Sequence, residues 1–284
     1  MKKFAALFIA VALSASVLFS QSESKPNTFF PKKTFTEPQK KGNFFFYWGW
    51  NKEVYTNSDI HFSGNNYDFT LHNVVATDKQ SKFDPNLYFG ITNITIPQYN
   101  YRVGYYISDH YSISAGFDHM KYVMVNDQSS NIDGSIHVGS QYDGDYKNQD
   151  FIIAQNFLRF EHTDGLNYLN TEIRRSDMVW SNKFLQVNIN EGIGAGVLYP
   201  RTNTTLLNNP RYDEFHVAGF GVAAVGSVQL SFFKHFFIQS EMKAGYINMP
   251  DIRTTMHVSD KASQHFEFFQ YNILFGGQFA LYGK

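Results

Sequence analysis

The chain has 284 residues, of which 43% are hydrophobic and 18% aromatic, and its formal net charge at pH 7 is −1. It contains no cysteine, which excludes disulfide bonds and a lipid anchor on an N-terminal cysteine. The nearly neutral charge gives no indication of a nucleic-acid partner. Beyond the N-terminus, no run of about 18 apolar residues predicts a transmembrane helix.

The N-terminus has the pattern of a secretory signal peptide over residues 1–22. A basic start, Met1-Lys2-Lys3, precedes a mostly apolar run, and Ser20-Gln21-Ser22 is a suitable cleavage site, with Ser14-Ala15-Ser16 as the alternative. An N-terminal membrane anchor is the other interpretation, but the run is short for a span. Residues 23–42 contain three prolines and five lysines without periodicity, and we expect a flexible periplasmic segment there.

Eight later stretches alternate apolar with small or polar residues. In the clearest, residues 99–107, the odd positions are apolar or aromatic and the even positions include Asn100, Arg102 and Gly104. A period of two predicts a strand whose two faces meet different surroundings. The expected strands cover residues 43–57, 97–108, 111–125, 156–176, 183–199, 215–232, 236–248 and 265–282.

The connections between these stretches alternate in length. Those after the second, fourth and sixth strands are short, and those after the first, third, fifth and seventh are long. This asymmetry is typical of bacterial outer-membrane barrels, with short periplasmic turns and long extracellular loops. We therefore predict an all-β fold, an eight-stranded antiparallel up-and-down transmembrane β-barrel over residues 43–284, located in the bacterial cell outer membrane.

A soluble barrel or sandwich would alternate in the same way with its apolar residues inside. Volume decides between the two, because 29 Phe, 18 Tyr and 3 Trp cannot converge on the axis of an eight-stranded barrel. The opposite face offers glycine, serine and charges of both signs, which are tolerated in a narrow lumen when they pair. The charged residues expected inside are Arg102, Asp118, Glu172, Arg174, Glu241 and Lys243.

Two details of the outer face follow from the same register. Aromatic residues near strand ends are candidates for the girdles that mark the membrane interfaces. Glu191 falls on the apolar face of its strand unless a β-bulge near Ile189–Glu191 changes the register. The girdle candidates are Tyr47, Trp48, Trp50, Tyr55, Tyr199 and Tyr246.

One segment concentrates residues that could carry out acyl hydrolysis. Around His162, a possible base, lie the carboxylates of Glu161 and Asp164 and the hydroxyl of Thr163. The segment resembles the lipid A deacylases, small outer-membrane barrels with a His-x-Ser-Asn pattern. It departs from them because Thr163 directly follows His162, and adjacent side chains of a strand point to opposite faces. A polar rim strand with a bulge at Gly165 is the favoured interpretation.

His61-Phe62-Ser63 keeps the i, i+2 spacing of the same pattern, and His61 and Ser63 are the second pair of catalytic candidates. Gly64 stands where the pattern has Asn. Asp143-Gly144-Asp145 suggests a divalent cation but lacks the ligand spacing of an EF-hand, so a solvated acidic loop is favoured. The ten histidines show no metal-ligand spacing, and we predict neither a metal site nor a cofactor.

Across residues 43–284 the pattern resembles the small outer-membrane barrels of the OmpA, OmpX and OmpW kind. The resemblance implies outer-membrane lipid, lipopolysaccharide and the barrel assembly machinery as partners. It leaves three roles open: a non-enzymatic barrel for envelope structure or surface interaction, which is favoured; a porin-like conduit or binder of small or hydrophobic molecules; and a lipid A acyl hydrolase. Fold alone does not choose among them.

Overall fold

The structure, a computed structural model, describes residues 40–90, 92–93 and 96–280. The expected signal peptide and residues 23–39 lie outside this range. In the described residues no helix is long and apolar enough to cross a membrane.

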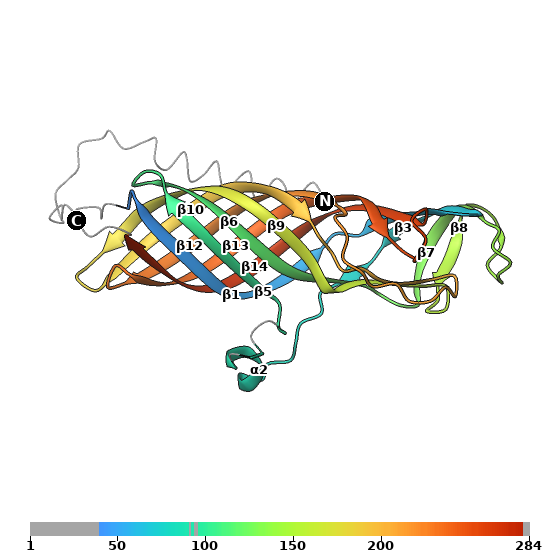
Figure 1. Ribbon diagram of the computed structural model, residues 1–284, viewed down its shortest axis with the longest axis horizontal. Helices are drawn as coiled ribbons and strands as arrows, with labels where there is room; N and C mark the ends of the chain where they lie inside the picture. The colour runs from blue at the N-terminus through green and yellow to red at the C-terminus, as the bar shows by residue number, and fades with distance from the viewer. Residues whose placement is uncertain (1–39, 91, 94–95, 281–284) are drawn as a thin grey trace, which may run out of the picture. The chain divides into compact units, whose positions relative to one another are not determined.

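Eight long strands form a closed antiparallel barrel (Figure 1). Neighbours in the chain pair with one another, and the ring closes because the first strand pairs with the last along their lengths, from Asn43↔Ala280 to Tyr55↔Phe268. The predicted number and order of strands are confirmed. In ring order the strands are β1 (Asn43–Tyr55), β5 (Tyr99–Tyr106), β6 (Tyr111–Met124), β9 (Leu158–Ser181), β10 (Leu185–Leu198), β12 (Gly219–Phe232), β13 (Phe236–Arg253) and β14 (Lys261–Ala280).

The register fixes the width of the barrel. A row of paired residues that leaves β1 at Phe44 crosses the other seven strands and returns to β1 at Val54, ten residues further along. Eight strands with this stagger tilt by about 40° and leave a backbone radius of about 8 Å, which side chains can fill. The intermediate residues of the row are Tyr105, Ile113, Ile173, Ile193, Ala224, Ala244 and Phe269.

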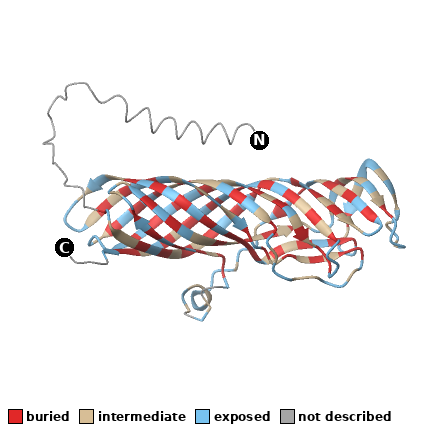
Figure 2. Cartoon of the chain, turned by 45° about the horizontal axis from the view of Figure 1, so that its top comes forward, coloured by how far each residue is buried: buried red, intermediate tan, exposed pale blue. Residues whose placement is uncertain are grey.

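The apolar face points outward. Figure 2 shows exposed and buried residues alternating along every barrel strand. Ile193 and Val103 on the outer face are 69% and 55% exposed, whereas Arg102 and Lys243 on the inner face are each 1% exposed. A closed ladder with an apolar exterior satisfies its backbone in lipid, where an open sheet would not.

The extracellular connections are not the irregular loops that we expected. Two hairpins pair with each other and with the outer end of β14, and they extend the sheet beyond one end of the barrel (Figure 1). These segments carry their own alternating pattern, which lies outside the eight longer stretches. The additional elements are β2 (Ser58–Gly64), β3 (Tyr67–Val74), β4 (Ala76–Thr77), α2 (Pro85–Phe89), β7 (Gln128–Ile136), β8 (Gly144–Ile153) and β11 (Asn203–Leu206).

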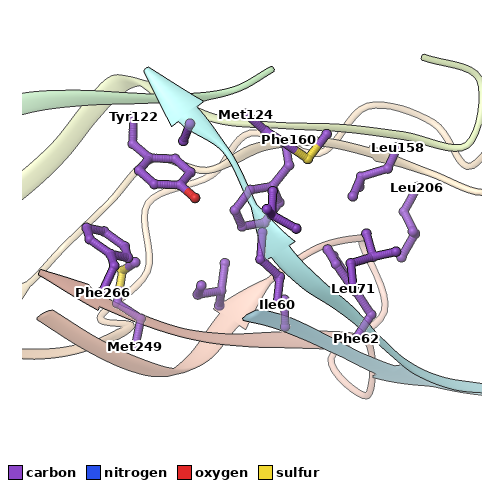
Figure 3. Packing of buried hydrophobic residues seen from close by; sticks show 14 of the residues in the cluster. Ile60, Phe62, Leu71, Tyr122, Met124, Leu158, Phe160, Leu206, Met249 and Phe266 are labelled. Carbon is purple, nitrogen blue, oxygen red and sulfur yellow. The ribbon is translucent and has the colours of Figure 1, made fainter. Parts of the chain in front are cut away.

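One continuous apolar core joins the extracellular sheet to the outer end of the barrel. Figure 3 shows Ile60 and Phe62 of β2 in one cluster with Tyr122 of β6 and Phe160 of β9. The rings of Phe62 and Phe160 meet edge to face at 5.8 Å, and Tyr122 stacks on Phe266 at 5.0 Å. We refer to the hairpins β2–β3 and β7–β8 with this core as the extracellular platform.

Two expectations about the outer wall are wrong. Tyr47 and Tyr55 are buried inside the lumen instead of lying in an aromatic girdle, because their odd positions on β1 face inward. Glu191 is exposed on the outer face with its pairing to β9 uninterrupted, and the register shift lies instead between Val187 and Asn188.

The wall has one thin place. β5 begins at Tyr99, so among the described residues no strand pairs with β1 beyond Trp50 on that side. Side chains close this gap: the Tyr55 hydroxyl donates to the carbonyl of Lys121 at 2.9 Å, and the Gln80 amide donates to the carbonyl of Asn51 at 2.8 Å. We refer to this place between β1 and β6 as the seam.

Candidate functional site

The structure brings together all six charged residues that the sequence placed in the lumen. Each side chain faces the lumen, as the alternating pattern of its strand predicted, and each is almost fully buried. Three basic and three acidic side chains therefore share one water-poor space, where their charges must compensate each other. They come from four strands: Arg102 (β5), Asp118 (β6), Glu172 and Arg174 (β9), and Glu241 and Lys243 (β13).

Glu172 lies at the centre of this ion network. Its carboxylate contacts Arg102 at 2.8 Å, Arg174 at 2.5 Å and the ammonium group of Lys243 at 2.9 Å. Arg174 also contacts Glu241 at 2.6 Å. Charge-assisted bonds of this kind are short and directional, so the network braces the strands across the lumen.

A second contact of Lys243 extends the network to β6. Its ammonium group lies 2.6 Å from Asp118, whose carboxylate also accepts a hydrogen bond from the Asn170 amide at 3.0 Å. Asn170 in turn accepts from Arg102 at 2.5 Å. The amide thus links the two halves of the network, a role that its sequence position alone did not reveal.

Glycines on facing strands provide the space that these long side chains need. A Cβ atom at Gly116 would lie 2.7 Å from the guanidinium carbon of Arg102, and one at Gly194 would lie 2.5 Å from Cγ of Glu172. A contact shorter than 3.0 Å would force the neighbouring side chain to shift. The charged side chains therefore occupy the space that the glycines of the inner face leave, and this space is not an empty channel.

Below the ion network, at the end with the short turns, the lumen is closed by an aromatic layer. Its members are buried and contact one another: Phe45, Tyr47, Tyr106, Phe237 and Leu274. A cavity of about 20 Å³ is lined by part of this layer and by Arg174. That volume is close to the minimum for one water molecule.

Lys40 closes the same end from the N-terminal side. Its ammonium group donates to Ser176 Oγ at 2.8 Å and to Asn188 Oδ1 at 3.0 Å, and it lies over the Tyr106 ring. We had placed this residue in a flexible segment, but its buried side chain belongs to the barrel floor. A cavity of about 270 Å³ lies beside it and is lined partly by Lys234 and His235.

Above the ion network, the lumen becomes apolar and merges with the core of the platform. Glu53 marks the boundary as a fourth buried carboxylate, which the sequence analysis missed. It accepts hydrogen bonds from the side-chain amides of Gln98 and Gln270. Lumen, floor and roof together fill the barrel with side chains.

The catalytic candidates on β9 do not assemble. His162 is fully buried beyond the apolar band, where its Nδ1 meets the Thr202 hydroxyl at 3.0 Å and the Tyr122 and Phe160 rings surround it. Burial lowers the pKa of His162 to about 3, which keeps the imidazole neutral. Its Nε2 has no hydrogen-bond partner among the described residues.

The acidic candidates of this segment point elsewhere. Asp164 is exposed and forms an ion pair with Arg201 at 3.3 Å. Glu161 accepts a hydrogen bond from Thr163 at 3.0 Å and lies 3.7 Å from Lys79. Gly165 has a φ of +128°, the left-handed region, and it lies directly after Asp164 where the pairing of β9 with β6 shifts register.

The second pair of candidates lies on the solvent face of the platform. His61 Nε2 contacts Asp68 Oδ1 at 3.0 Å, and Ser63 pairs directly across from Asp68. Among the described residues, no hydrogen bond joins the Ser63 hydroxyl to His61. A base and an orienting carboxylate are therefore present, without contact to the nucleophile that the pattern requires.

Further histidine–aspartate contacts cover the same face. His72 on β3 lies 3.1 Å from Asp59 on β2 and 2.9 Å from Asp133 on β7. Hydrogen bonding to Asp59 is the main cause that raises the pKa of His72. Both ring nitrogens face carboxylates, and only the imidazolium can donate to both. These contacts tie three strands of the platform together.

The acidic segment of the second connection is a turn. Asp143 accepts hydrogen bonds from the backbone N–H groups of Val138, Gly139 and Ser140, at 3.2, 2.8 and 2.9 Å. These bonds lower the pKa of Asp143. Its carboxylate therefore holds the β7–β8 turn, and Asp145 contacts His137 instead of sharing a ligand with it.

Comparisons with known proteins do not assign a role. No family model matches the chain, and no curated protein matches its sequence. Solved structures of similar arrangement include OprG of Pseudomonas aeruginosa, with 10% identity and a TM-score of 0.41 over 86% of this chain and 99% of that one. Neisserial surface protein A has 7% identity and a TM-score of 0.34, over 84% and 98% of the two chains.

The class of protein follows from the barrel itself. A closed eight-stranded ladder, an apolar outer face and a polar, ion-paired interior define a small outer-membrane β-barrel protein. Such a protein resides in the bacterial outer membrane, and the structure confirms the predicted orientation of the strand faces. The filled lumen and the platform are the two features that bear on its particular role.

Proposed function

We propose that the protein is a sealed, non-enzymatic barrel that holds the extracellular platform at the cell surface for interaction. The observation that carries this proposal is the continuous filling of the lumen. An aromatic floor, the ion network and an apolar roof succeed one another along the barrel. A hydrated path would have to break several short ion contacts.

The platform supports the interaction half of the proposal. Its strands bury one face in the apolar core and present the other to solvent, with polar contacts between strands. A surface built in this way is rigid, because its side chains are fixed by neighbours in adjacent strands. Rigid surfaces bind partners at a lower entropic cost than mobile loops.

Conductance measurements test whether the barrel is sealed. The full chain, folded into a planar bilayer beside a general porin as a positive control, is expected to give no steady current. A reproducible single-channel conductance would contradict the proposal, because it would require a continuous water path past Glu172 and Arg174.

A hairpin deletion tests the platform. Cells lacking the protein are complemented with the full chain or with a chain in which residues 126–156 are replaced by a short Gly-Ser linker. We expect the shortened chain to fold in the membrane but to lose any attachment or aggregation phenotype that the full chain restores. Equal restoration by both chains would remove the β7–β8 hairpin from the function.

Lipid and the barrel assembly machinery are the remaining proposed partners. Lys52 is exposed on the outer face of β1, and Lys121 lies on the outer face of β6 across the seam, toward the platform. Basic groups at this end of the apolar band suit the phosphates of lipopolysaccharide. Changing both residues to Gln is expected to weaken binding of purified lipid A, with Lys234→Gln at the other end as the matched control.

The seam favours a second candidate, a side entry for hydrophobic molecules. Side chains replace strand pairing there, and α2 lies against it, with the Trp50 ring 5.6 Å from Tyr88 and 5.2 Å from Phe89. The test is uptake of a fluorescent fatty acid by vesicles containing the protein. Uptake that ceases when engineered cysteines join residues 80 and 51 would support this candidate; uptake equal to that of empty vesicles would exclude it.

A further inference from the structure

Oxygen atoms converge in the seam, at the point where β1 loses its pairing with β5. The side-chain amide nitrogen of Gln80 lies 2.8 Å from the backbone carbonyl oxygen of Asn51. It also lies 3.1 Å from Asp78 Oδ2 and 3.1 Å from Gln98 Oε1. An amide nitrogen carries two hydrogens, so it cannot donate a full hydrogen bond to each of three oxygens. Acceptors from three separate segments therefore surround a point that a neutral amide serves incompletely.

Two further oxygens of the same residues have no hydrogen-bond partner in the part of the chain that the structure describes. They are Asp78 Oδ1 and Asn51 Oδ1, both buried, and Asn51 as a whole is 4% exposed. The other oxygen of Asp78 accepts a hydrogen bond from the backbone N–H of Glu53 at 3.1 Å. The Asp78 carboxylate is thus satisfied on one side only. A buried acceptor without a donor is costly, and a bound ion is one of the few explanations for it.

The negative charge of the seam is also uncompensated. Glu53 is 2% exposed, and its carboxylate accepts hydrogen bonds from two neutral side-chain amides. Among the described residues neither Glu53 nor Asp78 forms an ion pair. The lysines of this region, Lys79 and Lys121, contact a carboxylate of β9 and a backbone carbonyl instead. The ion network deeper in the lumen balances its own charges, so the two carboxylates leave a surplus of negative charge at the seam.

We propose that the seam binds one divalent cation, and that Ca²⁺ is the ion its ligands suit best. Carboxylate, backbone carbonyl and amide oxygens are the ligands that Ca²⁺ takes, in irregular geometry and with waters to complete the set. Asp78, the carbonyl of Asn51 and Gln98 Oε1 are the protein ligands. Gln80 is exposed, so its amide can turn its oxygen to the ion in place of its nitrogen. Glu53 supplies the second negative charge.

The site draws its ligands from three segments that are far apart in the chain, which is why the spacing of residues in the sequence did not indicate it. In the described residues no three His, Cys, Asp or Glu side chains form a metal cluster, and most of the ligands here are neutral oxygens. A bound cation joins the segment after β4 to β1 and to the residue before β5. It thereby replaces the missing strand pairing and holds the wall closed, whether or not the lumen conducts.

Terbium luminescence tests the site, because Tb³⁺ occupies Ca²⁺ sites and a nearby indole, here Trp50, sensitises its emission. The full chain is folded into phosphatidylcholine vesicles without lipopolysaccharide, whose phosphates bind the same ions, and is stripped with EDTA. We expect saturable emission from one ion per chain, which added Ca²⁺ displaces. Asp78→Asn removes the charged ligand and should weaken the affinity by about tenfold or more. The matched control is Asp150→Asn, an exposed carboxylate on β8, which should leave the affinity unchanged.

Gln80→Lys distinguishes a cation site from a carboxylate with a purely structural role. The new ammonium group brings three hydrogens and a positive charge to the three oxygens, so it should take the place of the ion. We expect this variant to give no terbium emission and to resist protease cleavage within residues 76–98 without Ca²⁺, whereas EDTA should expose this segment in the wild type. Migration on a gel without heating verifies that each variant is folded. The absence of saturable emission from the wild type, an unchanged affinity in folded Asp78→Asn, or an equal loss in Asp150→Asn would each overturn the proposal.

Discussion

Replacing Lys243 with Met removes one cation from the ion network and leaves one carboxylate stranded. Lys243 lies 2.6 Å from Asp118 and 2.9 Å from Glu172. Glu172 keeps both of its arginine partners, whereas Asp118 keeps an amide donor, Asn170. At an effective dielectric constant of about 20, the attraction across the shorter contact is about 6 kcal/mol. Relaxation of nearby polar groups offsets part of it, so the free energy of unfolding should fall by about 3–5 kcal/mol.

The assay is equilibrium urea unfolding in lipid vesicles, followed by tryptophan fluorescence and by gel migration without heating. The control is the double variant Lys243→Met with Asp118→Asn, which removes the pair without leaving a buried charge. It should be more stable than the single variant, as a double-mutant cycle for a buried ion pair requires. A single variant as stable as the wild type, or a double variant less stable than the single one, would refute the reasoning, since the lumen would then be hydrated.

Two further predictions concern the platform. Because contact with Asp59 raises the pKa of His72, its imidazolium stabilises the β2–β3–β7 sheet fully below the ordinary histidine pKa of about 6.5; this contribution is lost as pH rises through the raised value. Amide hydrogen exchange in these strands should therefore accelerate between pH 6 and 8 by more than the intrinsic pH dependence of exchange. His72→Gln should remove this additional acceleration. If the acceleration is unchanged in the variant, another group causes it. Gly134 has a φ of +114°, and an added Cβ would lie 2.1 Å from the carbonyl oxygen of Asp68. Gly134→Ala should accordingly lower platform stability by about 1–3 kcal/mol in a limited-proteolysis assay, more than Gly139→Ala, whose Cβ meets nothing within 4 Å; equal effects would show that no clash occurs.

Strand periodicity predicted the barrel because lipid and lumen impose opposite demands on alternate residues. The six ions of the network were identified from this alternation alone, without knowledge of the pairing. Their contacts could not be predicted, since they depend on which residues of four different strands lie at the same depth in the lumen. Asn170 and Glu53 were missed for the same reason, because polar residues at inner positions carry no signal for a particular partner.

The platform was missed because its strands are short and lie in connections that the barrel pattern assigns to loops. Tyr67, Phe69 and Leu71 alternate with polar residues just as the barrel strands do. Strict alternation of apolar and polar residues over four positions or more in a long connection therefore indicates a strand. Lys40 could not be placed, because it precedes the first alternating stretch and has no period to fix its face.

At Glu191 the error was to predict an irregularity, a β-bulge, that the strand does not have there. We assumed that a charge on the apolar face must be removed by a shift of register. The backbone keeps its register there, and an arginine on the adjacent strand accompanies the carboxylate. A charged residue on the apolar face can thus keep its register when a residue of opposite charge lies directly across from it.

The pairing of β14 sets an order on assembly. Its inner part closes the ring with β1, and its outer end, Lys261–Gln264, pairs with β2. Neither pairing can form without this last strand, although every other platform strand precedes it in the chain. Closure of the ring and completion of the platform edge at β2 therefore both depend on the C-terminal strand, which couples the two parts of the fold.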